Sequence, residues 1–324
     1  MELLNVPNFS IVIEWENLRF ADIGVTKKML QSVAKQIREI SQNHSLHPEI
    51  IIAFNKDVVQ DYDIDQFAKN YLQDCLSLID LKIIPTPDLN YYEQKNYAAE
   101  YSSNEILILM DSDVIPDEGW LYSLLQPFND PTVSVVGAGD YIDPVTPFEK
   151  GFNLFWIMPP KNDLDSKTAQ LEPFVPNNVA FRREVFLANK YPKTPAFRGA
   201  TVDHYHLIKS KGYKILHSKS RVRHCTTNGL RHIVVRALTE GHDKYLAWRG
   251  SHDKYQSDST KKHPIAKFFK DKYYLFKERK KYLEMSPKDY VGVFVFGIIF
   301  FGFALTGFLL ASMEPRLIRK TIKF

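Results

Sequence analysis

The amino-acid sequence predicts an α/β fold in which a mostly parallel sheet is flanked by helices. Short apolar runs alternate with stretches whose apolar residues recur every three or four positions, as strands alternating with helices require. The run at residues 106–110 is apolar at every position, which is typical of a strand buried on both faces of a parallel sheet. With 324 residues, the chain is long enough for one large α/β domain and additional segments.

The first two elements show both periods. Residues 9–13 are a short apolar run and predict the first strand. In residues 24–42 the apolar side chains are three or four apart, which predicts a helix with one face packed inward. The elements expected next, in chain order, are a strand at 49–54, a helix at 64–79, a strand at 81–84, a helix at 91–101, and strands at 106–111 and 133–137. Their alternation predicts right-handed βαβ units.

The regular pattern weakens after residue 140. Six prolines between residues 144 and 176 break any long element, so we expect loops and short pieces that cover a cleft. Ordered elements are expected again at residues 180–187, in a short helix at 203–211, in a strand at 213–218 that ends near His224, and in a helix at about 230–248.

Composition limits the possible classes of protein. The net charge of +4 is modest, so we expect no general affinity for nucleic acid. The two cysteines, Cys75 and Cys225, form neither a disulfide framework nor a zinc spacing, and they suit a reducing compartment. Residues 1–8 lack the basic start and apolar core of a signal peptide.

The C-terminal part predicts contact with a membrane. Residues 290–312 contain no charged side chain, and a helix of about 20 residues is enough to cross a bilayer core. Before this expected transmembrane helix, residues 261–281 hold nine Lys or Arg among aromatic residues. This composition indicates an interfacial segment on anionic lipid. The alternative is a solvated helix face whose aromatic side chains pack on the main domain.

These features divide the chain into five expected parts. They are a catalytic domain at 1–228, a helical extension at 229–260, the basic interfacial segment at 261–289, the transmembrane helix at 290–312 and a basic tail at 313–324. The basic segment places the catalytic domain on the cytoplasmic face of the membrane, although the tail beyond the span is basic too.

Small residues recur along the expected span. Gly297, Ala304 and Ala311 are spaced by seven, and Gly307 lies four residues before Ala311. Such a stripe allows close approach of helices in lipid and predicts a possible homo-oligomer. The alternative is a single helix that only anchors the chain, because glycine and alanine are common in membrane spans.

An aspartate pair closes the buried run, with Asp111 and Asp113 two residues apart. They follow the carboxyl end of a strand, where open α/β sheets bind their ligands. Hard divalent cations, with phosphate oxygens and water, are the usual partners of such carboxylates. A metal–diphosphate site is one interpretation, and a strand-end turn with solvated aspartates is the other.

The order of several segments resembles family 2 glycosyltransferases of the GT-A fold. The segments are residues 9–13 as the first nucleotide-binding strand, 91–99 as the helix before the metal strand, 106–113 with the DxD motif, 116–121 as its continuation, 177–186 as the acceptor-side segment, 201–207 as the acidic catalytic motif, 211–213 and His224. The resemblance covers roughly residues 8–225 and implies a nucleotide-diphospho-sugar transferase.

The resemblance implies a role for each of eight residues. Asp203 is the general base, Asp113 and His224 bind the metal, and Asp111 contacts the metal or the ribose. The remaining residues expected to contact the donor or acceptor are Glu14, Asn55, Lys95 and Asn178. The implied cofactors are Mn²⁺ or Mg²⁺ and a nucleotide-sugar donor, with a UDP-sugar the first choice. A lipid-linked or saccharide acceptor and anionic membrane lipid are the further partners.

Three departures from the family pattern concern the nucleotide and the base. Glu14-Trp-Glu-Asn17 replaces the turn that usually follows the first strand. Asn55 stands where an aspartate usually holds the nucleotide base. Val202-Asp203 replaces the usual Glu-Asp pair, which leaves the base in place if Asp203 is the working carboxylate.

Each site residue also has a structural interpretation. Asp203 fits the N-cap of a helix over 204–211, and Lys95 fits a solvated helical lysine. His224 fits a buried, hydrogen-bonded histidine, and Asn177 and Asn178 fit residues that only shape a loop. A metal cluster of His204 and His206 is less favoured than surface or core positions for these side chains.

The sequence therefore favours an inverting, metal-dependent glycosyltransferase in envelope polysaccharide or glycolipid synthesis. One alternative is a membrane-tethered module that binds nucleotide-sugars without turnover. Another is a nucleotidyltransferase, but that class needs a basic, glycine-rich opening after the first strand, and Glu14-Trp-Glu16 is the opposite.

Overall fold

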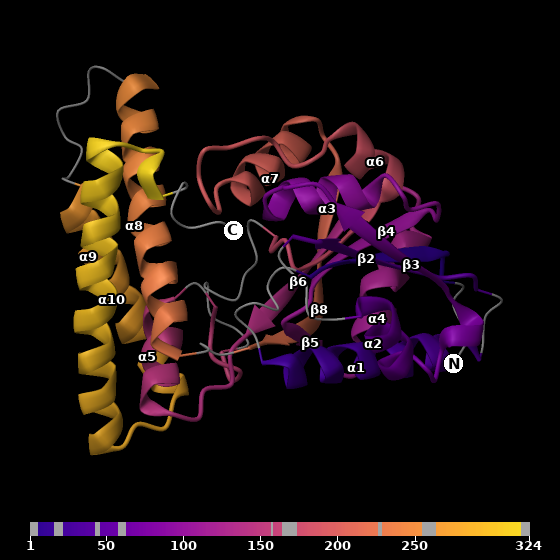
Figure 1. The fold of residues 1–324 in the computed structure, drawn as a ribbon, viewed down its shortest axis with the longest axis horizontal. Helices are drawn as coiled ribbons and strands as arrows, with labels where there is room; N and C mark the ends of the chain where they lie inside the picture. The colour runs from indigo at the N-terminus through magenta and orange to yellow at the C-terminus, as the bar shows by residue number, and fades with distance from the viewer. Residues whose placement is uncertain are drawn as a thin grey trace. The chain divides into compact units, whose positions relative to one another are not determined.

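The computed structural model describes residues 6–15, 22–42, 46–57, 63–156, 158–163, 174–225, 229–254 and 264–318. Two compact units make up the chain, and both are drawn in Figure 1. The first unit contains residues 1–141, 170–193 and 200–225. The second unit contains residues 142–169, 194–199 and 226–324.

An eight-stranded mixed sheet forms the centre of the first unit, in the order β3-β2-β1-β4-β7-β6-β8-β5. The strands are β1 (Phe9–Glu14), β2 (Glu49–Asn55), β3 (Asp80–Thr86), β4 (Ile106–Asp111), β5 (Val114–Pro116), β6 (Val133–Tyr141), β7 (Asn178–Arg182) and β8 (Lys214–His224). Strands β1 to β4 are paired in parallel, as are β6 and β8. Antiparallel pairs join β7 to β4 and β6, and β5 to β8. The predicted α/β fold is confirmed.

Helices cover both faces of this sheet (Figure 1). They are α1 (Ile23–Ser41), α2 (Ile64–Tyr71), α3 (Tyr91–Ala99), α4 (Trp120–Leu125), α6 (Arg183–Ala188) and α7 (Ala200–Ser210), with short 3-10 helices at Leu76–Leu78 and Gln126–Asn129. Alternate residues of β4 enter two separate cores. Ile106, Ile108 and Met110 pack in the core of α1, α2 and α4. Leu107 and Leu109 pack in the core of α3, α6 and α7. Apolar residues at every position of the strand follow from this burial on both faces.

Two helix boundaries and one additional strand differ from the sequence-based expectation. Helix α2 ends at Tyr71 rather than near residue 79, and α7 begins at Ala200, three residues earlier than expected. The last strand is one continuous element that reaches His224. Strand β5 was not expected, because three residues are too short to show a period.

The second unit contains four longer helices: α5 (Pro147–Phe155), α8 (Gly229–Lys254), α9 (Pro264–Arg279) and α10 (Pro287–Met313), with a 3-10 helix at Lys280–Tyr282. Helix α10 packs mainly on α8 and α5. Its first turn is fixed by a capping box of Ser286 and Asp289, and Lys150 of α5 lies 2.9 Å from Asp289. Phe152, Phe296 and Phe300 share one apolar cluster with residues of α8.

The small residues of α10 make this packing close. A Cβ atom on Gly307 would lie 2.1 Å from the Leu238 carbonyl oxygen, and one on Gly241 would lie 1.9 Å from that of Ala304. The expected oligomer face of Gly297, Ala304, Gly307 and Ala311 is buried within this chain. The prediction that this face joins two copies is therefore wrong, because α8 and α5 already cover it.

Helix α10 is the one described helix that is long and apolar enough to cross a membrane, by length and composition alone. The sequence predicted a lone span at residues 290–312. In the structure one face of α10 is buried against protein, and the opposite face exposes apolar side chains that include Val291, Phe294, Ile298 and Leu309. The exposed apolar side chains named above thus lie on the face of α10 that points away from the protein.

Helix α9 covers most of the basic segment that the sequence predicted. On its inner side Lys272 pairs with Glu240 of α8 at 2.6 Å, and Arg279 donates to the carbonyls of Asn153 and Trp156. Exposed positions on α9 include Lys267, Lys270, Phe269, Tyr273, Tyr274 and Lys277. Phe268 and Phe269 contact Phe301 of α10, in the second unit and not in the main domain, and Tyr273 and Tyr274 are exposed. Residues 261–263, Arg319, Lys320 and Lys323 lie outside the described part of the chain.

Candidate active site

The carboxyl ends of β1 and β4 place two buried acids side by side. The parallel register pairs Glu14 with Asp111, the last residue of each strand. A buried lysine of α3 pairs with Asp111, because Lys95 Nζ lies 2.6 Å from Asp111 Oδ1 and the Lys95 side chain is 0% exposed. The sequence-based interpretation of Lys95 as a solvated helical lysine is therefore wrong.

Tyr91 completes the surroundings of Asp111. The Tyr91 hydroxyl donates to Asp111, with distances of 2.8 Å to Oδ1 and 2.9 Å to Oδ2. Burial, reinforced by the charge of Asp111, raises the pKa of Tyr91 well above its usual value. The phenol therefore stays protonated and remains a donor. Lys95 and Tyr91 together fix the Asp111 carboxylate on the side facing α3.

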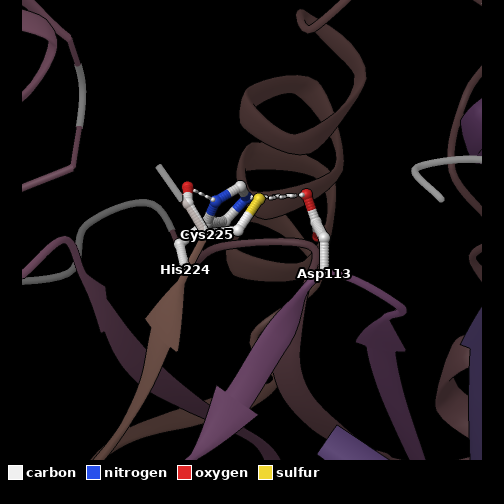
Figure 2. Close-up of side chains that lie close together, drawn as sticks. All are labelled: Asp113, His224 and Cys225. Atoms are coloured by element: carbon white, nitrogen blue, oxygen red, sulfur yellow. Dashed lines mark hydrogen bonds and ion pairs between the residues drawn. The ribbon is translucent and has the colours of Figure 1, made fainter. Parts of the chain in front are cut away.

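Asp113 lies two residues farther along, between β4 and β5, and meets the end of β8 (Figure 2). Strand β5 pairs Val114 with His224, and the Cys225 amide donates to the Asp113 carbonyl at 3.0 Å. His224 Nε2 lies 3.6 Å from Asp113 Oδ2, and Cys225 Sγ lies 3.5 Å from the same oxygen. The three ligand atoms lie within 4.8 Å of one another.

This cluster has the properties of a cation site. Asp113 is 1% exposed, and its Oδ1 atom has no hydrogen-bond partner among the described residues. A buried carboxylate oxygen without a partner carries a desolvation cost that a bound cation removes. His224 Nδ1 lies 2.9 Å from the Cys225 carbonyl oxygen, which can only accept. Nδ1 therefore carries a proton, and Nε2 is the nitrogen on the side of Asp113.

The structure separates the two aspartates that the sequence grouped. Asp113 and His224 come together as expected, and the group of possible ligands found among the described residues does not include Asp111. Both aspartates are buried, so the solvated-turn interpretation is wrong. The sequence left two interpretations of His224 open: a buried histidine or a metal ligand. The two are compatible, because the His224 side chain is buried and lies in this cluster.

Two asparagines expected near the donor or acceptor make contacts within the protein. Asn178 accepts from Trp120 Nε1 at 2.7 Å and donates to the Gly139 carbonyl at 2.6 Å, so it joins α4 to β6. Asn55 accepts from the Asp57 amide at 2.9 Å and donates to Asp88 at 3.3 Å. Asn178 is the first residue of β7, so the interpretation that it only shapes a loop is wrong. The neighbouring Asn177 is buried, and its side-chain oxygen has no hydrogen-bond partner among the described residues.

Asp203 lies in the first turn of α7 and is exposed. Because the helix begins at Ala200, the N-cap interpretation of Asp203 is wrong. Thr201 of the same turn bonds Tyr92 at 3.0 Å, which ties α7 to the helix that carries Tyr91 and Lys95.

The histidines that flank Asp203 do not form a cluster. His204 is buried among the rings of Phe174, Phe181, Phe186 and Tyr191, whereas His206 is exposed. Burial lowers the pKa of His204 to about 4, against a smaller opposing effect of a backbone hydrogen bond with Asn189. The less favoured His204–His206 metal cluster is therefore excluded.

Sequence reasoning missed Cys225 and the role of Tyr91. An isolated cysteine has no ligand spacing, and only its position directly after His224 at a strand end could have indicated its role. Tyr91 precedes Lys95 by four residues on α3, so both side chains lie on one face of the helix. This four-residue spacing is the feature of the sequence that could have indicated a shared role for Tyr91 and Lys95.

Comparisons with known proteins add the following findings. The family model for glycosyl transferase family 2 matches residues 24–188. No curated protein matches the chain. Among solved structures, a mannosyltransferase PcManGT from Pyrobaculum calidifontis in complex with GDP-Man and Mn²⁺ is similar at 13% identity and a TM-score of 0.47, over 96% of this chain and 77% of that one. GalNAc-T7 with UDP, GalNAc and Mn²⁺ is similar at 17% identity and a TM-score of 0.44, over 68% of this chain and 43% of that one.

Proposed function

This chain belongs to glycosyl transferase family 2, and from that premise we propose that it transfers a sugar from a nucleotide-diphosphate donor to an acceptor hydroxyl, with inversion at the anomeric carbon. The chain is a glycosyltransferase with the expected GT-A fold. Family membership thus favours glycosyl transfer over the nucleotidyl transfer considered from the sequence. The observation that carries the proposal is the buried Asp113 carboxylate, whose Oδ2 atom lies beside His224 and Cys225 and whose Oδ1 atom has no hydrogen-bond partner among the described residues.

A divalent cation fits the donor set of this cluster. Asp113 offers an anionic oxygen, and His224 offers a neutral nitrogen, which together suit Mn²⁺ and, less well, Mg²⁺. When bound, such a cation supplies positive charge that stabilises the nucleoside diphosphate as it leaves. In the described structure Asp113 and His224 would hold it.

Asp111 and its neighbours at the carboxyl ends of β1 and β4 position the nucleotide-sugar donor. Lys95 and Tyr91 hold the Asp111 carboxylate in one orientation, where it can accept a hydrogen bond from a ribose hydroxyl or from water. Glu14 and Asn55 end the neighbouring strands β1 and β2, and we assign them to the side of the nucleotide. The ends of parallel strands are where α/β sheets bind nucleotides. A UDP-sugar is the proposed donor.

Asp203 acts as the general base. Its exposed carboxylate in the first turn of α7 can accept the proton of an acceptor hydroxyl as that hydroxyl attacks. The acceptor is proposed to be lipid-linked or a saccharide, in envelope polysaccharide or glycolipid synthesis.

Two variants test the roles of the metal site and the base. Asp113→Ala should abolish metal-dependent nucleotide binding and turnover, whereas Asp203→Asn should keep nucleotide binding and lower turnover by about a hundredfold or more. The assay is hydrolysis and transfer of nucleotide-sugars with Mn²⁺, with and without a chelator. Full turnover of Asp113→Ala in chelator would refute the metal site. Near-normal turnover of Asp203→Asn would refute the base.

Membrane association is proposed through the outer faces of α9 and α10. These faces combine exposed basic and aromatic residues on α9 with exposed apolar residues on α10, which suits an anionic lipid surface. Helix α8 packs along α10, and its exposed Lys244 lines the same apolar cavity as Phe301 and Leu305. A lysine at the centre of a bilayer costs about 2.5–3.5 kcal/mol or more. We therefore propose that α10 lies in the interface of the cytoplasmic leaflet.

A further inference from the structure

We propose that Cys225 supplies a sulfur ligand to the metal site, so that the site is an Asp–His–Cys centre that selects thiophilic divalent cations over Mg²⁺. This inference rests on the metal site of the proposed function. Thiolate ligands favour Zn²⁺, Co²⁺ and Cd²⁺, whereas Mg²⁺ requires oxygen ligands in a near-octahedral arrangement. The sulfur therefore narrows the choice of cation that Asp113 and His224 alone leave open.

The backbone holds the cysteine at the cluster. The antiparallel register of β5 and β8 sets His224 opposite Val114, one residue after Asp113. The Cys225 amide then donates to the Asp113 carbonyl at 3.0 Å, which continues the pairing by one more bond. Asp113 and Cys225 therefore stay adjacent for as long as the sheet is intact.

Two of the three ligand separations are those of a tetrahedral centre. With metal–sulfur bonds near 2.3 Å and metal–nitrogen or metal–oxygen bonds near 2.0–2.1 Å, two ligands of a tetrahedron lie about 3.3–3.6 Å apart. Asp113 Oδ2 lies 3.5 Å from Cys225 Sγ and 3.6 Å from His224 Nε2. The third separation, between sulfur and nitrogen, is within 4.8 Å. Three protein ligands leave a fourth position open for an oxygen of the donor, as in catalytic sites.

A thiol that only donates a hydrogen bond to Asp113 is the competing explanation. That bond uses Oδ2 and leaves the buried Oδ1 without a partner among the described residues. Within the same part of the chain, Asp113 also has no ion pair with a lysine or arginine, so neither of these side chains offsets its charge. A metal bound to this carboxylate supplies the missing positive charge, which a thiol hydrogen bond does not. On binding, the thiol releases its proton to solvent and the sulfur lone pair bonds the metal, without oxidation or reduction.

Cobalt spectroscopy on the full-length chain, stripped of metal with a chelator, tests this assignment. Titration with Co²⁺ should produce a sulfur-to-cobalt charge-transfer band in the near ultraviolet. Cys225→Ser and Cys225→Ala should lose this band and keep the folded circular-dichroism spectrum, because the cysteine is only partly buried. Cys75→Ser is the matched control. Cys75 is buried in the core of α1 and α2, so this variant should keep the band if it folds.

Competition between metals gives a second measurement. The preference of the wild type for Zn²⁺ over Mg²⁺ should fall at least tenfold in Cys225→Ser, whose oxygen is a harder ligand. Cobalt binding that Asp113→Ala abolishes, but that shows no sulfur band in the wild type, would overturn the cysteine assignment and leave the proposed metal site standing. A wild type that binds no Co²⁺ at all would overturn both.

Discussion

At the scale of single residues, Lys95 and Asp111 form a buried ion pair within the candidate active site. Lys95→Met leaves the Asp111 charge buried without its cation, so we expect the free energy of unfolding to fall by about 3–5 kcal/mol. Lys69→Met is the matched control, because Lys69 and Asp65 are also 2.6 Å apart but both about half exposed. That loss should stay below about 1 kcal/mol. Denaturant unfolding followed by circular dichroism measures both.

The double variant Lys95→Met with Asp111→Asn distinguishes charge burial from packing. The asparagine side chain carries no charge, so this variant should be more stable than Lys95→Met alone. Equal losses in the single and double variants would show that Lys95 stabilises the fold by packing rather than by neutralising Asp111.

The sequence predicted some residue contacts well and others poorly. Asp113 and His224 were expected at one site because the resemblance to family 2 glycosyltransferases implies a metal-binding role for both. Cys225 could not be found this way, since its contact depends on the register of β5, a strand of three residues. A solvated Lys95 was one interpretation of the sequence. The sequence does not show which segments pack over a helix face, so it could not reveal that the Lys95 side chain is buried.

At the scale of elements, Glu49 at the start of β2 connects three neighbouring segments. Burial alone would raise its pKa, but hydrogen bonds from Lys82 at 2.6 Å, from Ser10 and from Ser103 outweigh burial and lower that pKa to about 2. The carboxylate therefore stabilises the fold fully above pH 4.5, and this contribution is lost as pH falls toward 2. We expect about 3 kcal/mol to be lost across this window.

Glu49→Gln tests this expectation, because glutamine cannot titrate. Unfolding free energies of the wild type and the variant should differ most near neutral pH and converge toward pH 2. A difference that stays constant with pH would show that Glu49 acts through shape and not through its charge.

Helix packing in the second unit gives a test with a control on the same helix. Gly307→Ala places a Cβ against the Leu238 carbonyl, so α8 and α10 must separate and the chain should lose stability. Gly302→Ala meets nothing within 4 Å and should be neutral or stabilising by up to about 1 kcal/mol. Thermal unfolding in mild detergent measures both. Equal melting temperatures for the two variants would contradict the close packing of α8 and α10.

Helices and strands were predicted correctly where the hydrophobic pattern extends over many residues. The prediction failed where the structure of a segment depends on the strands that pair with it. The nineteen residues of α1 show an unambiguous helical period, and the apolar run of β4 shows burial on both faces. Strand β7 reads as a short ordered segment in sequence, and its antiparallel direction depends on β4 and β6. The early start of α7 at Ala200 has no cap signal in the sequence.

At the scale of the whole chain, the C-terminal helices show most clearly where sequence pattern is insufficient. The apolar composition of α10 predicts a membrane helix, but hydropathy does not say how much of its circumference is free. The stripe of Gly297, Ala304, Gly307 and Ala311 was read as an oligomer face, and it packs within the chain. The composition identified the most apolar helix, and tertiary packing decides which of its faces is exposed.

The last prediction concerns how the chain binds membranes. An interfacial α10 should bind vesicles that contain anionic lipid, lose binding in high salt, and be released from membranes by alkaline carbonate. Phe294→Asp should abolish vesicle binding, because its side chain is 68% exposed on the outer face of α10. Tyr101→Asp, at an exposed aromatic residue of the first unit, should leave binding unchanged. Sedimentation with vesicles of neutral or mixed lipid measures each effect. If the chain resists carbonate extraction and binds neutral vesicles equally well, α10 crosses the bilayer, and α8 must then leave the face of α10 that it covers.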